Sequence, residues 1–273
     1  MGITMQRESS APLALMAENI QFKKNQKMIL QNVQFELSQG EFVGLIGPNG
    51  AGKSSLLKIL AGLDSNFSGQ VSLVSEQKIA LNKIHRLDRA KTIAFLPQQE
   101  IPAWPLSVEH VVGLSRLPWT DAMSWQSPAD EQAIELAIQQ ADLQHLRHRH
   151  LLELSGGELQ RTLLARVFAG EQPIILVDEP ITALDPYHQL HVMELLAEKA
   201  KAKGMVCAAL HDLNLAATFC NRLVLLDQGK IIASGQPADV LTNENLRRVY
   251  GIEAYVDCRE EGVVIIPRKR VKK

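Results

Sequence analysis

The residues with the clearest chemical potential are GPNGAGKSS, residues 47–55, where the glycines, lysine and first serine fit the phosphate-loop pattern. An apolar run precedes this segment and a helix-forming run follows it, which is the setting that phosphate binding requires. In such a loop the backbone N–H groups surround the β-phosphate, the lysine reaches the β- and γ-phosphates, and the serine hydroxyl ligates Mg²⁺. The predicted nucleotide contacts are Gly47, Pro48, Asn49, Gly50, Ala51, Gly52, Lys53, Ser54 and Ser55.

An acidic pair, Asp178 and Glu179, follows the apolar run of PIILVDEP. Ligands of open α/β sheets bind at the carboxyl ends of the strands, which is where this pair falls. Taken alone, two acidic residues after a strand are commonly a turn or a helix cap. Beside a phosphate loop they predict more, with Asp178 holding Mg²⁺ and Glu179 polarising the attacking water.

A second glycine-rich turn occurs in LSGGELQR, residues 154–161, ahead of another helix-like run. A turn of this kind at a helix N-terminus presents backbone N–H groups and the positive end of the helix dipole to an anion. The chain therefore carries two anion-binding turns. The pattern by itself leaves open which anion the second one takes.

Strands that alternate with helices must position these motifs, and such alternation is typical of a mostly parallel sheet covered on both faces. Continuous apolar runs, as buried strands require, occupy residues 42–46, 174–177, 206–210 and 223–226. Near the N-terminus the runs NVQFEL and GQVSLVS alternate apolar and polar residues instead. This second pattern predicts an antiparallel β layer.

From about residue 100 to 160 the chain becomes helical and polar, which predicts a helical subdomain inserted into the α/β fold. Within DEQAIELAIQQADLQHL the apolar residues at helical spacing are Ala133, Ile134, Leu136, Ala137 and Ile138. After about residue 245 we expect weak β character. The closing IPRKRVKK is predicted to be a solvated basic tail.

The composition argues against several classes of protein. With 29 basic and 30 acidic side chains, the chain lacks the positive charge of a nucleic-acid-binding protein. Its cysteines, Cys207, Cys220 and Cys258, are too widely spaced for a disulfide framework or a zinc site and suit a reducing compartment. No apolar run approaches the length of a membrane span, and the first residues do not form an export signal. A cytosolic location is expected.

The motifs, in the order phosphate loop, Gln98, LSGGE, acidic pair, TALD and His211, resemble the ATP-binding cassette of ABC transporters over residues 13–255. The resemblance implies an α/β fold of the P-loop NTPase type that hydrolyses ATP with Mg²⁺, and it leaves residues 256–273 as a C-terminal extension. In that family two cassettes associate head to tail. Each ATP lies between the phosphate loop of one subunit and the LSGGE loop of the other, so the second turn would serve the partner of a homodimer.

The resemblance also implies individual roles outside the phosphate loop. Gln98, with Gln99 as the neighbouring alternative, resembles the glutamine that contacts Mg²⁺ and links the core to the helical subdomain. His211 resembles the histidine that contacts the γ-phosphate and acts with Glu179. The expected catalytic set is Glu179, His211 and Gln98, the metal set Ser54, Gln98 and Asp178, and the set completing the partner's site Ser155, Gly156, Gly157 and Asp185.

One departure from the family pattern concerns adenine. The family places an aromatic side chain just after the first strand, in a register that falls here on Lys24. Either Phe22, two residues earlier, or Lys24 itself is therefore expected to contact the base. Because stacking on a base contributes about 1–3 kcal/mol, the change predicts a weaker grip on the nucleotide or a relaxed base preference.

Three segments resemble the ATPases of importers for chelated iron, haem and cobalamin: HDLNLAA (211–217), LTNENLRRVYGIEAYV (241–256) and LPQQEIPAWPLSVEHVVGLSRLPW (96–119). This implies integral membrane permease subunits as partners, contacted through residues 99–117, and a substrate-binding protein engaged indirectly. The protein would lie peripherally on the cytoplasmic face of the inner membrane and bind no nucleic acid. The alternatives are a soluble ABC ATPase not linked to transport and a non-hydrolysing subunit.

Overall fold

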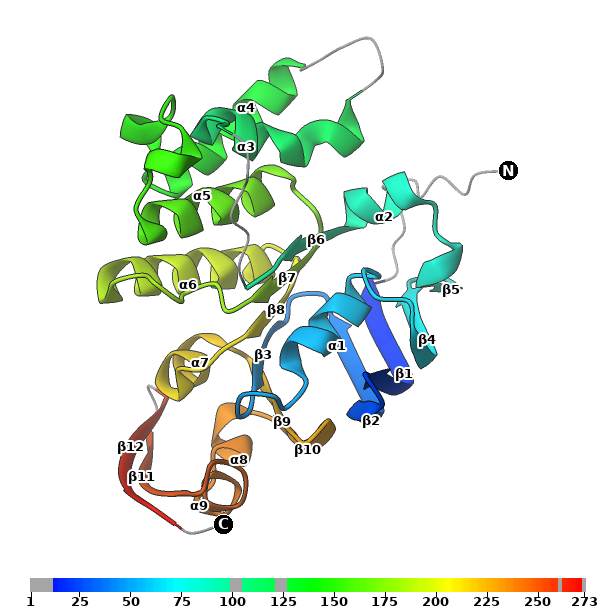
Figure 1. The fold of residues 1–273 in the computed structure, drawn as a ribbon, viewed down its shortest axis with the longest axis vertical. Helices are drawn as coiled ribbons and strands as arrows, with labels where there is room; N and C mark the ends of the chain where they lie inside the picture. Colours follow the sequence, from blue (N-terminus) through cyan, green and yellow to red (C-terminus); the bar gives the residue numbers. More distant parts are fainter. Residues whose placement is uncertain (1–11, 99–104, 121–126, 260–261, 272–273) are drawn as a thin grey trace.

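The computed structural model describes residues 12–98, 105–120, 127–259 and 262–271 and consists of two β-sheets, a helical subdomain and a C-terminal hairpin (Figure 1). The central sheet has the strand order β10-β9-β3-β8-β7-β6. Its strands are β3 (Phe42–Ile46), β6 (Ile93–Leu96), β7 (Ile174–Asp178), β8 (Met205–Ala209), β9 (Arg222–Asp227) and β10 (Lys230–Gly235). Only β10 runs antiparallel to its neighbour, so the prediction of a mostly parallel sheet is confirmed.

Both faces of the central sheet are buried, which explains why its strands are continuously apolar. On β7, for example, Ile175 and Val177 pack against the helices, whereas Ile174 and Leu176 pack against the second sheet. The strands β3, β8 and β9 divide their side chains between the two cores in the same way. A period of two along each strand therefore supplies two hydrophobic cores at once.

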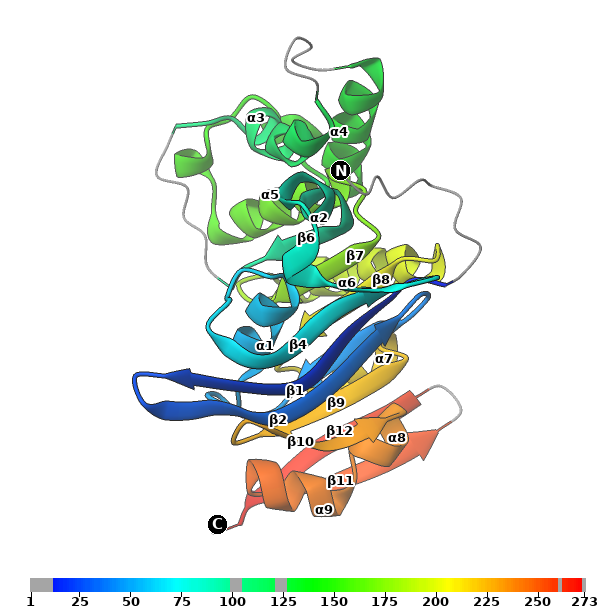
Figure 2. The ribbon, with the colours of Figure 1, turned by 90° about the vertical axis from the view of Figure 1, so that its right-hand side faces the viewer.

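The second sheet is antiparallel, with the order β2-β1-β4-β5, and confirms the β layer expected near the N-terminus. It consists of β1 (Ala14–Lys24), β2 (Lys27–Ser38), β4 (Phe67–Val74) and β5 (Lys78–Ala80). Helix α1 (Lys53–Leu60) packs between the two sheets (Figure 2). Its residues Leu56, Leu57, Ile59 and Leu60 are fully buried, so the helix that follows the phosphate loop is held on its apolar side.

The chain between β6 and β7 forms the helical subdomain. It contains α3 (Val108–Gly113), the 3₁₀ turn η2 (Leu114–Trp119), α4 (Pro128–Gln140), two further turns at Gln144–Leu146 and Leu151–Glu153, and α5 (Gly156–Ala169). The expected boundary at residue 160 falls inside α5. Of the apolar residues predicted for α4, Leu136 is half exposed, because the buried stripe follows Ile134, Ala137 and Ile138. Short α2 (Arg86–Thr92) lies against η2, while α6 (Pro186–Lys201) and α7 (Leu213–Phe219) cover the same face of the central sheet.

The C-terminal part is more ordered than the sequence suggested. After α8 (Pro237–Val240) and α9 (Asn243–Asn245) comes a π-helical turn, η5 (Leu246–Tyr250), and then a hairpin of β11 (Ile252–Arg259) and β12 (Gly262–Arg270). The expected boundary after residue 255 falls inside β11. The basic residues 268–270 belong to β12 and not to a tail, because Val263 and Ile265 of the same strand are buried against the core. No helix in the described ranges has both the length and the apolar character of a membrane span.

A buried ion pair joins the parts of the helical subdomain. Arg116 of η2 is 6% exposed, and its Nε donates to Oδ1 of Asp130 on α4 at 2.7 Å. The same guanidinium donates to the Ala169 carbonyl at the end of α5 and to Glu171, each at 2.9 Å. One cation therefore ties η2, α4 and the end of α5 together.

Removing one partner of this pair should destabilise the protein strongly. We expect Asp130→Ala to lower the free energy of unfolding by up to about 3–5 kcal/mol, because it removes the buried carboxylate and leaves the buried Arg116 only the exposed carboxylate of Glu171. The exposed Lys78–Glu18 pair supplies the control, where Glu18→Ala should change that free energy by about 1 kcal/mol or less. Urea unfolding measures both, and equal effects would contradict this account.

Candidate nucleotide-binding site

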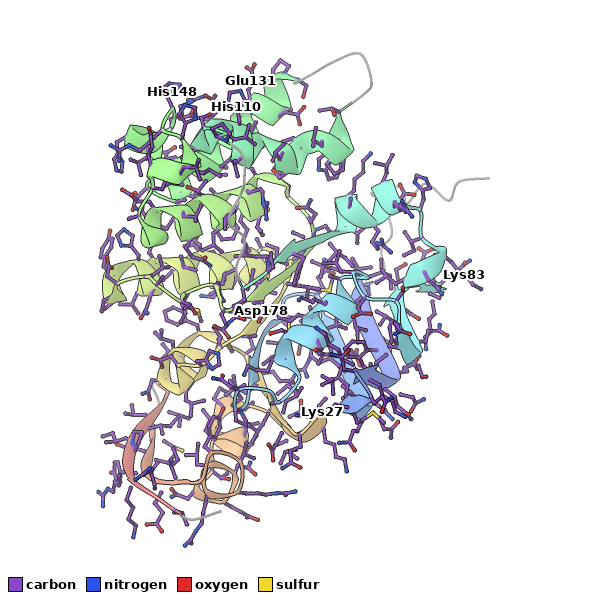
Figure 3. All side chains as sticks on the ribbon, viewed as in Figure 1. Lys27, Lys83, His110, Glu131, His148 and Asp178 are labelled. Carbon is purple, nitrogen blue, oxygen red and sulfur yellow. The ribbon has the colours of Figure 1, made fainter. Side chains whose placement is uncertain are left out.

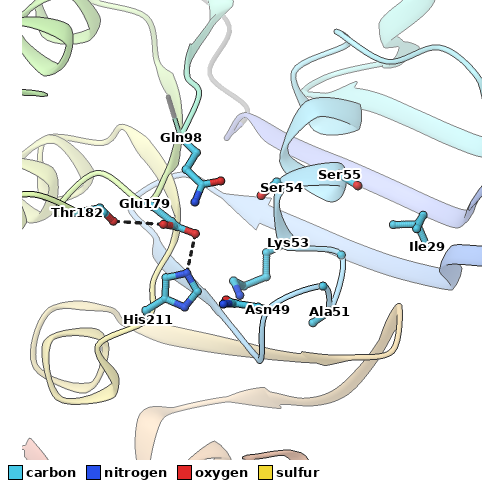
Figure 4. Close-up of a pocket in the computed structure, with 12 residues that line it drawn as sticks. Ile29, Asn49, Ala51, Lys53, Ser54, Ser55, Gln98, Glu179, Thr182 and His211 are labelled. Carbon is cyan, nitrogen blue, oxygen red and sulfur yellow. Dashed lines mark hydrogen bonds and ion pairs between the residues drawn. The ribbon is translucent and has the colours of Figure 1, made fainter. Parts of the chain in front are cut away.

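Four neighbouring strands of the central sheet bring the predicted residues to one edge. The phosphate loop follows β3, His211 follows β8, Asp178 ends β7 and Gln98 follows β6. Because parallel strands all end on the same side, these positions surround one pocket of about 680 Å³ (Figure 4). Its lining residues are Ile29, Asn49, Gly50, Ala51, Gly52, Lys53, Ser54, Ser55, Gln98, Glu179, Thr182 and His211.

The phosphate loop depends on glycine at two points. Gly47 has φ +146°, and a Cβ atom there would lie 2.1 Å from the Leu226 carbonyl oxygen. Gly52 has φ +111° at the N-cap of α1, and its Cβ would lie 2.7 Å from a methyl carbon of Leu30. Larger residues would thus be strained and would clash, and the loop could not bring its N–H groups to the start of the helix.

Lys53 lies within the loop that it serves. Its side chain is nearly buried, and Nζ donates to the carbonyl oxygens of Gly47 at 2.7 Å and Pro48 at 3.3 Å. Burial lowers the pKa of Lys53, and the carboxylates of Glu179 and Asp178 act in the opposite direction. An ammonium held in this way is positioned for the oxygens of a polyphosphate.

Asp178 and Ser54 fit a magnesium ion. Asp178 is 1% exposed near the middle of the molecule, and its Oδ1 has no hydrogen-bond partner among the described residues (Figure 3). Burial raises the pKa of Asp178, and a hydrogen bond with Ser54 opposes that shift. A buried carboxylate oxygen left unpaired beside a hydroxyl is the kind of oxygen site that Mg²⁺ prefers.

Glu179 is held by three side chains. His211 Nε2 lies 2.6 Å from Glu179 Oε1, and Thr182 Oγ1 donates to Oε2 at 3.2 Å (Figure 4). Burial would raise the pKa of Glu179, but the hydrogen bond with His211, helped by Gln98 and Thr182, lowers it below its usual value. The carboxylate is therefore ionised at neutral pH, as a general base must be.

The other predicted contacts lie outside this pocket. Ser155 caps α5, where its Oγ accepts from Glu158 N at 3.3 Å and its N donates to Glu158 Oε2 at 2.8 Å. The two glycines that follow lie against residues 183–184, and Asp185 caps α6 by accepting from His188 N at 2.9 Å. The LSGGE loop and Asp185 are thus close to each other, and neither lines the pocket of its own chain.

Of the two residues expected to contact the adenine base, Phe22 and Lys24, the structure excludes one. Phe22 is buried in the core, paired with Leu30 and Phe67, so its ring is not available to a base. Lys24 is exposed and does not line the pocket. Instead Ile29, which sequence reasoning missed, lies at the pocket wall. The sequence signal that could have identified Ile29 is its position directly before the buried Leu30 on an alternating strand.

Thr182 was also missed, although a hydroxyl three residues after Glu179 is well placed to bond it within a turn. The alternative glutamine, Gln99, lies outside the described residues. Gln98 itself lines the pocket and contributes to the pKa of Glu179, so it is in position for the predicted role.

Comparison with known proteins agrees with this geometry. Residues 30–182, more than half of the chain, match the family described as ABC transporter. The chain belongs to the ABC transporter family. It is 40% identical over 265 residues to a Bordetella avium protein named hemin import ATP-binding protein HmuV, with 93% of this chain and 99% of the relative covered. The Pseudomonas aeruginosa protein of the same name is 40% identical over 252 residues, covering 90% of this chain and 96% of the relative.

Two solved structures of ABC proteins share the fold. An inward-facing transporter described as being of metal-chelate type matches with a TM-score of 0.77 and 28% identity, over 94% of this chain and 98% of that chain. The dimeric cassette MJ0796 bound to ADP and Pi matches with a TM-score of 0.71 and 30% identity, over 82% and 98%. This ABC protein is therefore an ATP-binding ATPase with the P-loop NTPase fold.

Replacing Asp178 should separate stability from metal binding in this ABC ATPase. Because the carboxylate is buried and half unpaired, we expect Asp178→Asn to raise the free energy of unfolding of the nucleotide-free protein by about 0.5–2 kcal/mol. The same change should abolish the stabilisation that Mg²⁺ adds in the presence of ATP. Thermal unfolding with and without Mg-ATP tests this. The mutant should melt higher than the wild type without ligand, and a lower midpoint would contradict the assignment.

Proposed function

We propose that this protein is the ATP-hydrolysing subunit of an ABC importer that drives uptake of haem, or of a related metal chelate, through a membrane permease. The observation that supports hydrolysis most directly is the Glu179–His211 pair at 2.6 Å beside the phosphate loop. A non-hydrolysing subunit would have no need of an ionised, oriented base. The relatives named for hemin import support the import of haem.

In this proposal each residue of the pocket has a chemical task. The phosphate loop and Lys53 bind the phosphates of ATP, and Ser54, Asp178 and Gln98 hold Mg²⁺, which supplies positive charge to the phosphate oxygens when bound. Glu179 accepts a proton from the attacking water, and His211 orients that carboxylate from the γ-phosphate side. Ile29 packs against the nucleotide at the wall of the pocket.

We further propose a head-to-tail homodimer. The LSGGE loop and Asp185 lie outside the pocket of their own chain, yet Ser155 and the N-terminus of α5 form an anion-binding turn. A second copy would bring this turn to the γ-phosphate held by Lys53, so that each chain completes the other's site. The dimeric form of the similar cassette MJ0796 supports this arrangement.

Complementation between two inactive subunits should reveal the shared site. Ser155→Arg damages only the turn and Lys53→Ala only the loop, so a mixed dimer retains one intact composite site. We expect each mutant alone to lose at least about 100-fold in ATPase rate, and the mixture to recover up to about a quarter of wild-type activity.

Mixing either single mutant with the Ser155→Arg/Lys53→Ala double mutant is the control, since no intact site can form. Verified heterodimers that hydrolyse no more ATP than this control would exclude the composite site.

The proposed permease contact lies on the helical subdomain between residues 99 and 117. Residues 99–104, including Trp104, lie outside the described ranges, but Leu114 and Leu117 are 43% and 54% exposed. Leu114 borders a pocket of about 260 Å³ between β6, η2 and α5. Because β6 leads directly to Gln98, a partner seated here would sense nucleotide binding. The subunit would then lie on the cytoplasmic face of the inner membrane, with the substrate-binding protein reached only through the permease.

A charge at this surface should uncouple transport from hydrolysis. In proteoliposomes containing the permease, we expect Leu117→Glu to reduce permease-stimulated ATPase and ATP-driven haemin transport by about tenfold or more, and to leave the isolated subunit within about twofold of wild type. Leu63→Glu is the matched control, because Leu63 is 63% exposed and lies outside the helical subdomain. Proteoliposomes with this variant should transport haemin normally. If the proteoliposomes transported cobalamin or a ferric siderophore and not haemin, haem would be the wrong cargo. If no permease stimulated the ATPase activity, the result would favour the alternative of a soluble ABC ATPase that is not linked to transport.

A further inference from the structure

The C-terminal segment from residue 246 to residue 270, which we call the C-terminal brace, comprises η5 and the β11–β12 hairpin. It is anchored by apolar side chains, since Leu246, Val249, Val263 and Ile265 are all buried. A two-stranded hairpin is marginally stable alone, and this one gains its support by packing against α7 and α8 (Figure 1). Besides this packing, the brace makes a polar contact with α7, the helix that follows His211.

This contact reaches α7, the short helix that begins just after His211. Asn214, in the first turn of α7, pairs with the backbone of Ile265 on β12 as a strand would. Its Oδ1 accepts from Ile265 N at 2.8 Å, and its Nδ2 donates to Ile265 O at 3.2 Å. Asp212, the residue after His211, caps the same turn by accepting from the N–H groups of Asn214 and Leu215. His211 thus stands directly before a short helix that β12 holds in place.

We propose that the C-terminal brace positions the hydrolytic half of the ATPase site, with Asn214 fixing α7 on β12 and, through α7, His211. Asn214 is a positioning residue, since it does not line the pocket. The hydrogen bond between His211 and Glu179 is short at 2.6 Å and directional, so a small shift of α7 would displace His211 and change the orientation of the Glu179 carboxylate. The proposal concerns hydrolysis by the isolated subunit and does not depend on the cargo or on the permease.

This contact predicts a defect in hydrolysis and not in ATP binding. Asn214→Ala removes both hydrogen bonds to Ile265, so we expect the single-turnover rate to fall by about tenfold while the Kd for ATP stays within about twofold. Asn214→Asp keeps the acceptor for Ile265 N–H and loses the donor, so its rate should fall between those of wild type and Asn214→Ala.

Two variants in or beside the brace serve as controls. Tyr255→Phe removes a hydroxyl from an exposed ring that contacts Arg268, and Asn245→Ala removes a side-chain hydrogen bond to the Val240 carbonyl. Both should leave ATP affinity and hydrolysis unchanged. Calorimetric titration of the purified subunit with ATP, single-turnover hydrolysis and thermal midpoints should be measured on all four variants. If Asn214→Ala lowers only the midpoint and leaves the single-turnover rate unchanged, the brace supports folding alone and the proposal is wrong.

Discussion

The structure depends on one geometric constraint, which is that parallel strands end together. β3, β8, β7 and β6 are neighbours in the central sheet, so the loop of residues 47–55, His211, the acidic pair and Gln98 meet although they are far apart in sequence. The continuous burial of these strands on both faces makes their ends rigid. A rigid edge can hold a lysine, two carboxylates and a histidine at one site, with the Glu179 and His211 side chains 2.6 Å apart.

The local chemistry of this edge is unfavourable for the empty protein. Asp178 is buried with an unpaired oxygen, Lys53 is nearly buried, and Glu179 adopts a left-handed backbone conformation with φ +54°. Each feature costs stability, and each is relieved or used when a polyphosphate and a divalent cation bind. The opposite pKa shifts of Asp178 and Glu179 follow from their surroundings. Burial raises the pKa of both carboxyl groups, but at Glu179 the combined effects of His211, Gln98 and Thr182 outweigh it.

The chain divides its anion-binding elements between two surfaces. The phosphate loop faces its own pocket, whereas Ser155, the start of α5 and Asp185 lie together on the side of the helical subdomain. Such a division is economical in a symmetric dimer, because one surface patch and its counterpart are each used twice. The C-terminal brace contacts α7, the helix that follows His211, through Asn214.

Short-range patterns in the sequence were sufficient for the phosphate loop, the acidic pair, the buried strands and the antiparallel layer, because glycine placement and apolar periodicity act over a few residues. Only the tertiary structure decided which side chains share a pocket. It buried Phe22 and exposed Leu136, brought Ile29 and Thr182 to the site, and folded the basic C-terminal residues into β12. These outcomes depend on contacts between distant segments, as when Asn214 pairs with Ile265, and no local pattern encodes them.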